Sequence, residues 1–330
     1  MSRKAGGLRA WLREHKKRLK RIATITFVCV IVALLVQVGL TVEWDEVAQA
    51  MLKTPNTALL LASGVVAASY VVYTGFDLLG KWYTGHGVAT WRVMMVAFIS
   101  YAFTMNFSAA VGGLAMRLRL YGKQGLDTGQ IMRIMGLSIT TNWIGYCLVA
   151  GVIFALGAVQ PPSSWEIGGG PLRLIGVVMV GLALAYVALC AFSKQRSWKV
   201  RDHEIELPTL RIALIQLPLA MTNWALMGLV VFLVMPGETP YLSILGTLLI
   251  GSLVGAVAHI PGGLGVTEYV FITLLAPELP RAQVLGAILV YRALYYVAPV
   301  LIAGAWYLLL EARSPSRSAG KGGTPIARTG

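Results

Sequence analysis

Charged residues are scarce in this chain of 330 residues, since Asp, Glu, Lys and Arg together make up only 13%. An ordinary soluble domain carries about 25%. Hydrophobic residues reach 57%, and the longest polar regions are residues 1–21 and 193–211. No polar region is therefore long enough for a separate soluble catalytic domain. The composition indicates an integral membrane protein.

Residues that bind metals or form disulfides are also few and scattered. The chain has three cysteines and four histidines: Cys29, Cys147, Cys190, His15, His86, His203 and His259. The cysteines lie in apolar runs without CxxC spacing, which is typical of small apolar side chains. The chain also lacks a His-Glu-x-x-His motif, a Gly-x-Ser-x-Gly motif and a P-loop. We therefore expect no metal, no cofactor and no ATP-driven pumping.

Long hydrophobic runs are abundant. Six runs are long enough to cross a bilayer as helices, which takes about 20 residues: 22–40, 57–80, 137–159, 174–192, 212–235 and 282–310. Two more runs, 93–116 and 244–276, are apolar but interrupted. We predict an all-α polytopic membrane protein with about six full spans and two re-entrant helical hairpins in a pseudo-inverted arrangement.

The chain before the first span is strongly basic. Leu8, Trp11, Leu12 and Leu19 fall on one side of a predicted helix whose other side is basic, which suits an amphipathic segment on an anionic cytoplasmic leaflet. A positive-inside topology signal explains the same charges. Residues 37–44 offer no small-residue cleavage site, so an uncleaved anchor is expected. Residues 22–310 would then form one transmembrane domain, followed by a flexible basic cytoplasmic tail over 311–330.

The 28 Lys and Arg residues favour hairpins over full crossings for the two interrupted runs. With six spans both termini are cytoplasmic, and the basic residues left outside are Lys53, Arg173 and Arg281. With eight spans, the basic clusters at 117–133 and 194–211 would move outside, against the positive-inside rule.

Each interrupted run contains a stretch that breaks a helix: NFSAAVGG at 106–113 and PGGLG at 261–265. Proline lacks a backbone donor, and glycine adopts angles that other residues avoid. One hairpin would enter from the cytoplasm and the other from outside, as in inverted repeats whose broken helices meet near the midplane. Such backbone is tolerated at that depth only inside protein or beside a watered cavity.

Glu268 and Arg292 are the charges that span ends explain least. Placing either at bilayer depth costs about 2.5–3.5 kcal/mol on insertion scales. An ion pair between them, or snorkelling toward an interface, would offset that cost. Arg117 lies near the first break, where its guanidinium could bind a phosphate bidentately.

Other polar residues in apolar runs have simpler explanations. Arg119 is expected to anchor at the interface, and Asp77 to pair with Lys81 four residues later. Amides such as Asn106, Asn142 and Asn223 form interhelical hydrogen bonds or line a cavity, and the same alternatives hold for His259. Five aromatic residues are expected to serve packing or the interface rather than a binding box: Trp143, Trp224, Tyr291, Tyr295 and Tyr296.

The segment Pro261-Gly262-Gly263-Leu264-Gly265-Val266-Thr267-Glu268 resembles the Pro-Gly-Gly-x-Gly-x-x-Glu signature of the lysylphosphatidylglycerol synthase transmembrane-region family, in its bacterial inner-membrane branch. Tyr291-Arg292 with Tyr295 and Pro299, and Asn106 followed by Gly113 and Arg117, are also similar to that family. The resemblance implies a flippase-like integral membrane protein.

The first motif departs from the family pattern Pro-x-Arg-x-Gly-Glu-x-x-Arg. Ala109, Val111 and Leu114 stand at its Pro, Arg and Glu positions, so a symmetric pair of glutamates is lost. Full synthases of this family also carry a soluble aminoacyl-transferase domain. Because the polar regions here are too short for one, lysyl transfer is not expected.

Our hypothesis is an inner-membrane lipid translocase rather than an enzyme. The two hairpins would line a cavity open sideways to the bilayer, where Arg117 and Arg292 take a lipid phosphate and Glu268 pairs with an arginine when the site is empty. The hairpin-break residues that let backbone approach the headgroup are Gly112, Gly113, Pro261, Gly262, Gly263 and Gly265. The expected partners are anionic membrane phospholipids or lipid-linked substrates, and nucleic acid is not expected.

Two alternatives follow from the same residues. An intramembrane enzyme or accessory subunit would act on lipid-linked substrates with Glu268 and His259 as acid and base. A small-anion carrier would show solute flux without dependence on lipid. The sequence names neither the lipid nor the oligomeric state.

Overall fold

The computed structural model describes residues 44–107, 109–161, 168–200, 203–258, 260–275 and 279–313, and separate positions between 22 and 40. The predicted basic segment 1–21, most of the predicted first span and tail residues 314–330 lie outside the described residues, as does His259. The predictions made for them stay predictions.

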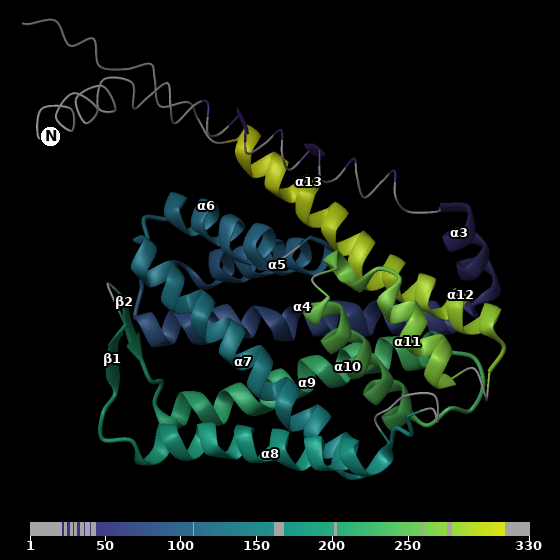
Figure 1. Ribbon diagram of the computed structural model, residues 1–330. Coiled ribbons are helices and arrows are strands. Elements are labelled where there is room, and N and C mark those ends of the chain that lie inside the picture. Colours follow the sequence, from purple (N-terminus) through teal and green to yellow (C-terminus); the bar gives the residue numbers. More distant parts are fainter. Residues whose placement is uncertain are drawn as a thin grey trace, which may run out of the picture.

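The described part is a bundle of apolar helices (Figure 1). Its α-helices are α3 (Trp44–Lys53), α4 (Asn56–Thr84), α5 (Thr90–Asn106), α6 (Met116–Lys123), α7 (Thr128–Ala155), α8 (Gly169–Phe192), α9 (Leu210–Val234), α10 (Tyr241–Val257), α11 (Val266–Leu275), α12 (Arg281–Arg292) and α13 (Ala298–Ala312). Shorter elements are the π-helices η1 (Ala109–Ala115) and η3 (Ala293–Val297), the 3-10 turn η2 (Pro261–Gly263), and the strands β1 (Ser197–Val200) and β2 (His203–Glu206).

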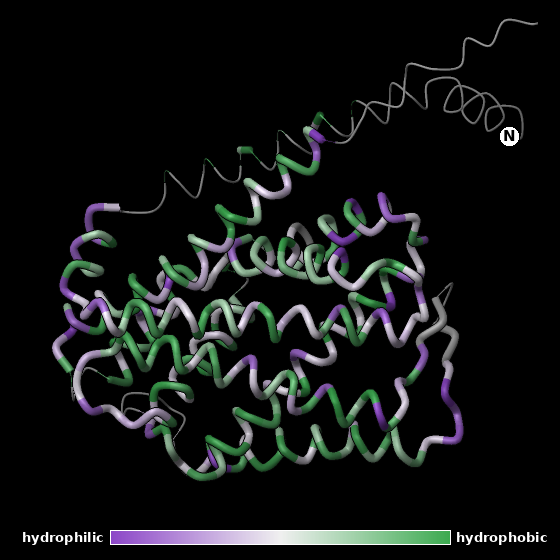
Figure 2. The backbone as a smooth tube through the Cα atoms, turned by 180° about the vertical axis from the view of Figure 1, so that it is seen from behind, coloured by the Kyte–Doolittle hydropathy of each residue, from purple (hydrophilic) through white to green (hydrophobic). Residues whose placement is uncertain are grey.

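Five helices are long and apolar enough to cross a membrane: α4, α7, α8, α9 and the continuous stretch Arg281–Ala312. They coincide with five of the six predicted full-length runs, so those runs are confirmed as helices of spanning length. In Figure 2 the longer hydrophilic stretches, drawn purple, lie at the two ends of the bundle, and green hydrophobic residues predominate between them, with a few short purple segments. This distribution is the one a bilayer requires of a helical bundle.

Small residues allow the central helices to approach closely. A Cβ added to Gly145 on α7 would lie 2.1 Å from Ala220 Cβ on α9. On the other side of α7, a Cβ on Gly151 would lie 2.9 Å from Gly176 O on α8. Helices in membranes associate through such small-residue contacts because lipid supplies no hydrophobic driving force between them. Helix α7 is thereby fixed between α8 and α9.

The first interrupted run folds back on itself. Helix α5 leads to the break and η1–α6 returns along it, so that Arg92 Nη1 at the start donates to Gln124 Oε1 at the end, at 2.7 Å. The break retains a π-helical turn over Ala109–Ala115. Both ends of this run therefore lie together, next to the start of α7.

The second interrupted run also folds back, through the break between α10 and α11. Gly237 before α10 lies so near Leu279 after α11 that a Cβ on Gly237 would be 2.8 Å from Leu279 Cδ2. Ser243 Oγ in α10 donates to Ala158 O, just beyond the end of α7, at 3.1 Å. The two hairpins thus begin at opposite ends of α7. Their placement relative to a membrane stays a prediction.

One feature departs from the all-helical prediction. The basic loop after α8 forms the antiparallel pair β1–β2, with Ser197 opposite Glu206. Pairing satisfies backbone groups there, and Glu206 ties the pair to the bundle through Arg133 and the hydroxyl of Tyr83. The last spanning stretch stays helical throughout and contains the π-helical turn η3 directly after Arg292.

Candidate functional site

A cavity of about 350 Å³ lies where the tips of the two hairpins meet. Gly113 of the first break lines it, together with Gly262 and Gly263 of the second. The tips are close, because a Cβ on Gly262 would lie 3.4 Å from Met105 O. The two breaks lie about half the chain apart in sequence and together enclose one cavity. Its volume is in the range of small-ligand sites.

One face of α7 forms a wall of this cavity. Its lining residues follow helical spacing: Met135, Ser138, Ile139, Asn142 and Trp143. Trp224 on α9 also lines the cavity, and its indole Nε1 donates to Asn142 O at 3.4 Å. Trp143 and Trp224 also pack edge-on against Tyr146, in agreement with the packing role expected for them.

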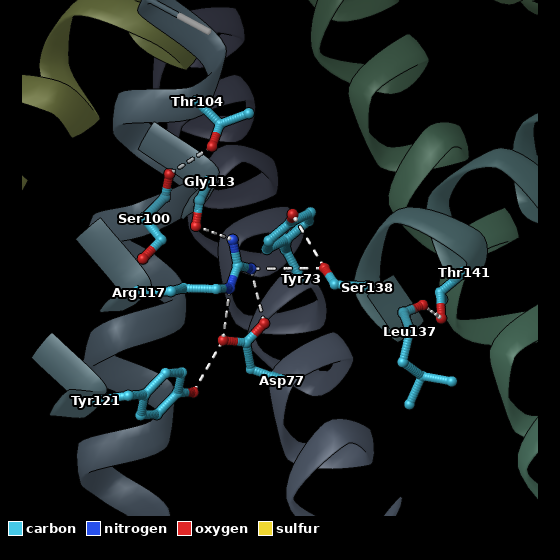
Figure 3. Close-up of polar contacts among 10 residues, drawn as sticks. All are labelled: Tyr73, Asp77, Ser100, Thr104, Gly113, Arg117, Tyr121, Leu137, Ser138 and Thr141. Atoms are coloured by element: carbon cyan, nitrogen blue, oxygen red, sulfur yellow. Dashed lines mark hydrogen bonds and ion pairs between the residues drawn. The ribbon is translucent and has the colours of Figure 1, made fainter. Parts of the chain in front are cut away.

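Arg117 is held by a buried carboxylate at the edge of the cavity (Figure 3). Its Nε donates to Asp77 Oδ2 at 3.1 Å and its Nη2 to Asp77 Oδ1 at 2.7 Å. Nη1 donates to Gly113 O at 3.1 Å, and the Tyr121 hydroxyl donates to Asp77 Oδ2 at 2.8 Å. A bidentate pair with further donors is the arrangement that stabilises charges in a low-dielectric interior.

This geometry corrects two expectations. Asp77 does not pair with Lys81, whose Nζ donates to Thr90 Oγ1, because burial of Asp77 makes the guanidinium of α6 the better partner. Nor is Arg117 open to a phosphate, since its side chain is 2% exposed and that of Asp77 is fully buried. Arg119 lies nearer the surface and pairs with Glu311 at 2.9 Å.

Arg292 is held in the same manner at the second break. It forms a two-point ion pair with Glu268, through Nε to Oε1 and through Nη2 to Oε2 at 3.0 Å. Nη1 donates to Gly262 O and Nη2 to Gly263 O, both at 2.9 Å. The predicted ion pair between these two residues is confirmed. The same arginine also satisfies carbonyls that the break leaves without helical partners.

The two arginine–carboxylate pairs differ in exposure. Side chains of the Arg292–Glu268 pair are 10% and 15% exposed, against 2% and 0% for Arg117–Asp77. Arg292 lies behind Gly262, Gly263 and Tyr296, which line the cavity, and its guanidinium carbon is 5.5 Å from the Tyr296 ring centre. The second pair is therefore the more accessible one. Tyr296 packs against Tyr291 and Tyr295, as expected, and also lines the cavity.

Asn106 connects the first break to the last spanning stretch. Its Nδ2 donates to Ala102 O and to Tyr296 O in η3, at 2.9 and 3.0 Å. The Tyr70 hydroxyl donates to the neighbouring carbonyl of Tyr295. These donors satisfy carbonyls at a π-helical turn, where the regular ladder is interrupted. Asn106 does not line the cavity, so it holds the wall in place rather than contacting its contents.

Buried hydroxyls form a network beside the cavity. The Ser69 hydroxyl lies 3.1 Å from Asn223 Oδ1 and 2.7 Å from the Tyr295 hydroxyl, which is 3.0 Å from that of Tyr101. Asn223 is thus an interhelical hydrogen-bonding residue, whereas Asn142 faces the cavity. Sequence reasoning missed Ser138 and Tyr101, although the spacing of Ser138 and Asn142 along α7 was a usable signal.

The two folded-back segments meet at a cavity inside a bundle of apolar helices, five of which are long enough to span a membrane. These features are those of a multi-pass membrane protein. The chain belongs to the family described as Lysylphosphatidylglycerol synthase TM region, whose family model matches residues 21–303. The resemblance seen in the sequence is confirmed.

Two relatives extend along most of the chain. Inner membrane protein YbhN of Escherichia coli (strain K12) is 41% identical over 296 residues, covering 89% of this chain and 93% of that protein. Uncharacterized protein slr0712 of Synechocystis is 26% identical over 284 residues, covering 84% and 88%. The first relative and the five apolar helices support a multi-pass location in the inner membrane.

Proposed function

We propose that this protein moves an anionic phospholipid between the leaflets of the inner membrane, with the headgroup passing through the central cavity. The observation that carries the proposal is the Arg292–Glu268 pair, which lies directly behind the cavity wall at a helix break. Both hairpins would be re-entrant and both termini cytoplasmic. The breaks would then meet near the middle of the bilayer, as in transporters with inverted repeats.

Exchange of Glu268 for a lipid phosphate explains how Arg292 can bind that phosphate without a large cost in free energy. A guanidinium matches phosphate and carboxylate with the same two-point geometry. When a lipid phosphate takes the place of Glu268, one charged pair replaces another, so Arg292 is never left unpaired in a low-dielectric site. The carbonyls of Gly262 and Gly263 hold the guanidinium during the exchange.

The second break allows the wall in front of Arg292 to move. Gly262, Gly263 and Gly265 have φ angles of 61°, 58° and 78°, in the left-handed region that favours glycine. The tip between α10 and α11 can therefore rearrange without the steric penalty of a side chain. Arg117, fixed by Asp77, would keep the first break rigid while the second opens.

The test is leaflet exchange of tail-labelled phosphatidylglycerol in proteoliposomes. We expect Arg292→Ala to slow exchange at least about a hundredfold, the loss that follows from removing a desolvated charged partner. Glu268→Gln should also slow exchange. A neutral amide displaces the bound phosphate from Arg292 poorly, so the empty site is restored slowly. Arg133→Ala is the matched control, since it removes an exposed ion pair and Arg133 does not line the cavity.

Three results would contradict the proposal. Unchanged exchange in Arg292→Ala would remove the arginine from the mechanism. A chemically altered lipid, detected by mass spectrometry, would favour the intramembrane enzyme. Anion flux into vesicles that lack anionic lipid would favour the small-anion carrier.

A further inference from the structure

We propose that Glu268 binds a proton each time a lipid phosphate binds at Arg292, so that the anion and the proton cross the membrane together. This inference rests on the proposed function and adds a coupled ion to it. Charge balance at the second break leads to it, because the phosphate takes the cation with which Glu268 is paired.

Glu268 has one cationic partner in the described part of the chain. Both of its carboxylate oxygens accept from Arg292, through Nε and Nη2. Its helix α11 packs on α10 and α12, and η3 follows α12. The other titratable residues of those three elements are Tyr241, Arg281, Tyr291, Tyr295 and Tyr296. The tyrosines are neutral at physiological pH, and Arg281 lies about three helical turns before Arg292. No second cation of these elements is therefore available to Glu268.

Arg117 at the first break cannot replace Arg292 as the partner. It already donates to both carboxylate oxygens of Asp77 (Figure 3), and its side chain is 2% exposed. Arg292 and Glu268 together carry no net charge, whereas a bound phosphate diester adds one negative charge and leaves Glu268 unpaired. An unpaired carboxylate in low-dielectric surroundings takes its neutral form instead. One proton on Glu268 restores a net charge of zero.

A proton can reach Glu268 more easily than it can reach Asp77. The Glu268 side chain is 15% exposed, whereas that of Asp77 is fully buried. Thr267, directly before Glu268, lines the cavity. The proton comes from the solution on the side where the lipid binds and is held on the carboxylate oxygen that the phosphate has displaced. It is released on the other side when Glu268 pairs with Arg292 again.

Proton binding is measured first on the purified protein in detergent. A short-chain phosphatidylglycerol is titrated in by calorimetry, near neutral pH, in two buffers with different heats of ionisation. We expect uptake of about one proton per lipid bound. Glu268→Gln should bind the lipid without proton uptake. Glu206→Gln is the matched control and should keep the uptake, because it changes an exposed carboxylate that is paired with Arg133.

The coupled movement is measured in proteoliposomes with tail-labelled phosphatidylglycerol. One anion and one proton transfer no net charge, so a pH gradient should drive the movement and a membrane potential should not. A gradient of about one pH unit should enrich the label about tenfold in the leaflet that faces the more alkaline solution, because a tenfold proton ratio then balances a tenfold lipid ratio. Vesicles without protein give the baseline.

The outcomes separate this inference from the proposed function. Lipid binding without proton uptake, or exchange that leaves the label equally distributed under the gradient, would overturn the coupling and leave translocation intact. Binding with proton uptake but without exchange would defeat translocation alone. Absence of binding would overturn both, and uptake retained in Glu268→Gln would show that another group holds the proton. Glycerophosphoglycerol, the same headgroup without tails, is titrated in parallel; proton uptake with it alone would assign the site to a soluble anion and overturn coupling to lipid.

Discussion

The two buried arginines have different tasks although their partners are similar. Each donates to a carboxylate and to a carbonyl of the adjacent break. Arg117 and Asp77 are enclosed, and Asp77 also accepts from Tyr121. Arg292 and Glu268 are partly exposed behind the cavity wall. The first pair therefore maintains the fold around the cavity, and the second is the one available for exchange with a ligand.

Removing Arg117 should destabilise the protein more than any surface arginine. We expect Arg117→Ala to lower the free energy of unfolding by about 3–5 kcal/mol, because Asp77 is left as an unpaired buried charge. Arg133→Ala, which breaks an exposed pair, should cost less than about 1 kcal/mol. Thermal unfolding in detergent measures both.

The double variant Arg117→Met with Asp77→Leu separates charge from packing. It should recover much of the lost stability, because it removes both charges and fills their space with apolar atoms. If Arg117→Ala unfolds at the temperature of the unmodified protein, the pair does not hold the first break.

The sequence predicted one of these pairs and missed the other for a physical reason. Glu268 and Arg292 are isolated charges in apolar runs, so each needs a partner at the same depth. Asp77 has Lys81 one helical turn away, and that local partner was sufficient to explain it. The contact with Arg117, 40 residues away, depends on how the first hairpin packs on α4, which spacing along the chain does not reveal.

At the scale of elements, both breaks were predictable from glycine and proline, but their conformations differ. The second break contains three glycines with positive φ. The first is π-helical, and its glycines have negative φ; Gly112 is needed there for close approach to α5.

The π-helix η3 has no glycine or proline in its sequence, and its Tyr296 carbonyl accepts a hydrogen bond from Asn106 of the first hairpin. A segment whose shape depends on a distant donor cannot be found from local sequence.

Neighbouring glycines in the first break should respond differently to the same substitution. A Cβ on Gly112 would lie 2.0 Å from the backbone N of Thr104, whereas one on Gly113 would meet Met135 Cε at 3.4 Å. We expect Gly112→Ala to destabilise the protein by at least about 1–3 kcal/mol, the usual range for overpacking, because backbone has to shift. Gly113→Ala should be nearly neutral, since an ordinary contact is made. Equal unfolding temperatures for the two variants would contradict this packing of η1 on α5.

At the scale of the whole molecule, the chain is organised as two helical hairpins of opposite direction around α7. Hydrophobicity predicted six spans, five of which are helices of spanning length in the described part of the chain, and glycine and proline predicted both interruptions. It also indicated hairpins through the count of basic residues. The cavity itself was not predictable in detail, because it depends on the tips meeting and on which face of α7 is turned inward.

The membrane placement of the first hairpin can be tested by labelling from one side. Gly87 precedes α5 and Gly122 lies near the end of α6; both are exposed, and a side chain at either position would meet nothing within 4 Å. In a background with Cys29, Cys147 and Cys190 replaced by serine, we expect Gly87→Cys and Gly122→Cys to react with a membrane-impermeant maleimide from the same, cytoplasmic side.

A control residue on the opposite face makes the result decisive. Arg281, exposed at the start of α12, is expected outside, so Arg281→Cys should react from the periplasmic side. If Gly87→Cys and Gly122→Cys react from opposite sides, the first run crosses the membrane completely. The contact between Arg92 and Gln124 would then be absent in the membrane, because one residue cannot donate to the other across a bilayer about 30 Å thick. Reaction from the same side would place the break inside the bilayer, where irregular backbone requires the protein-lined cavity that the two tips enclose.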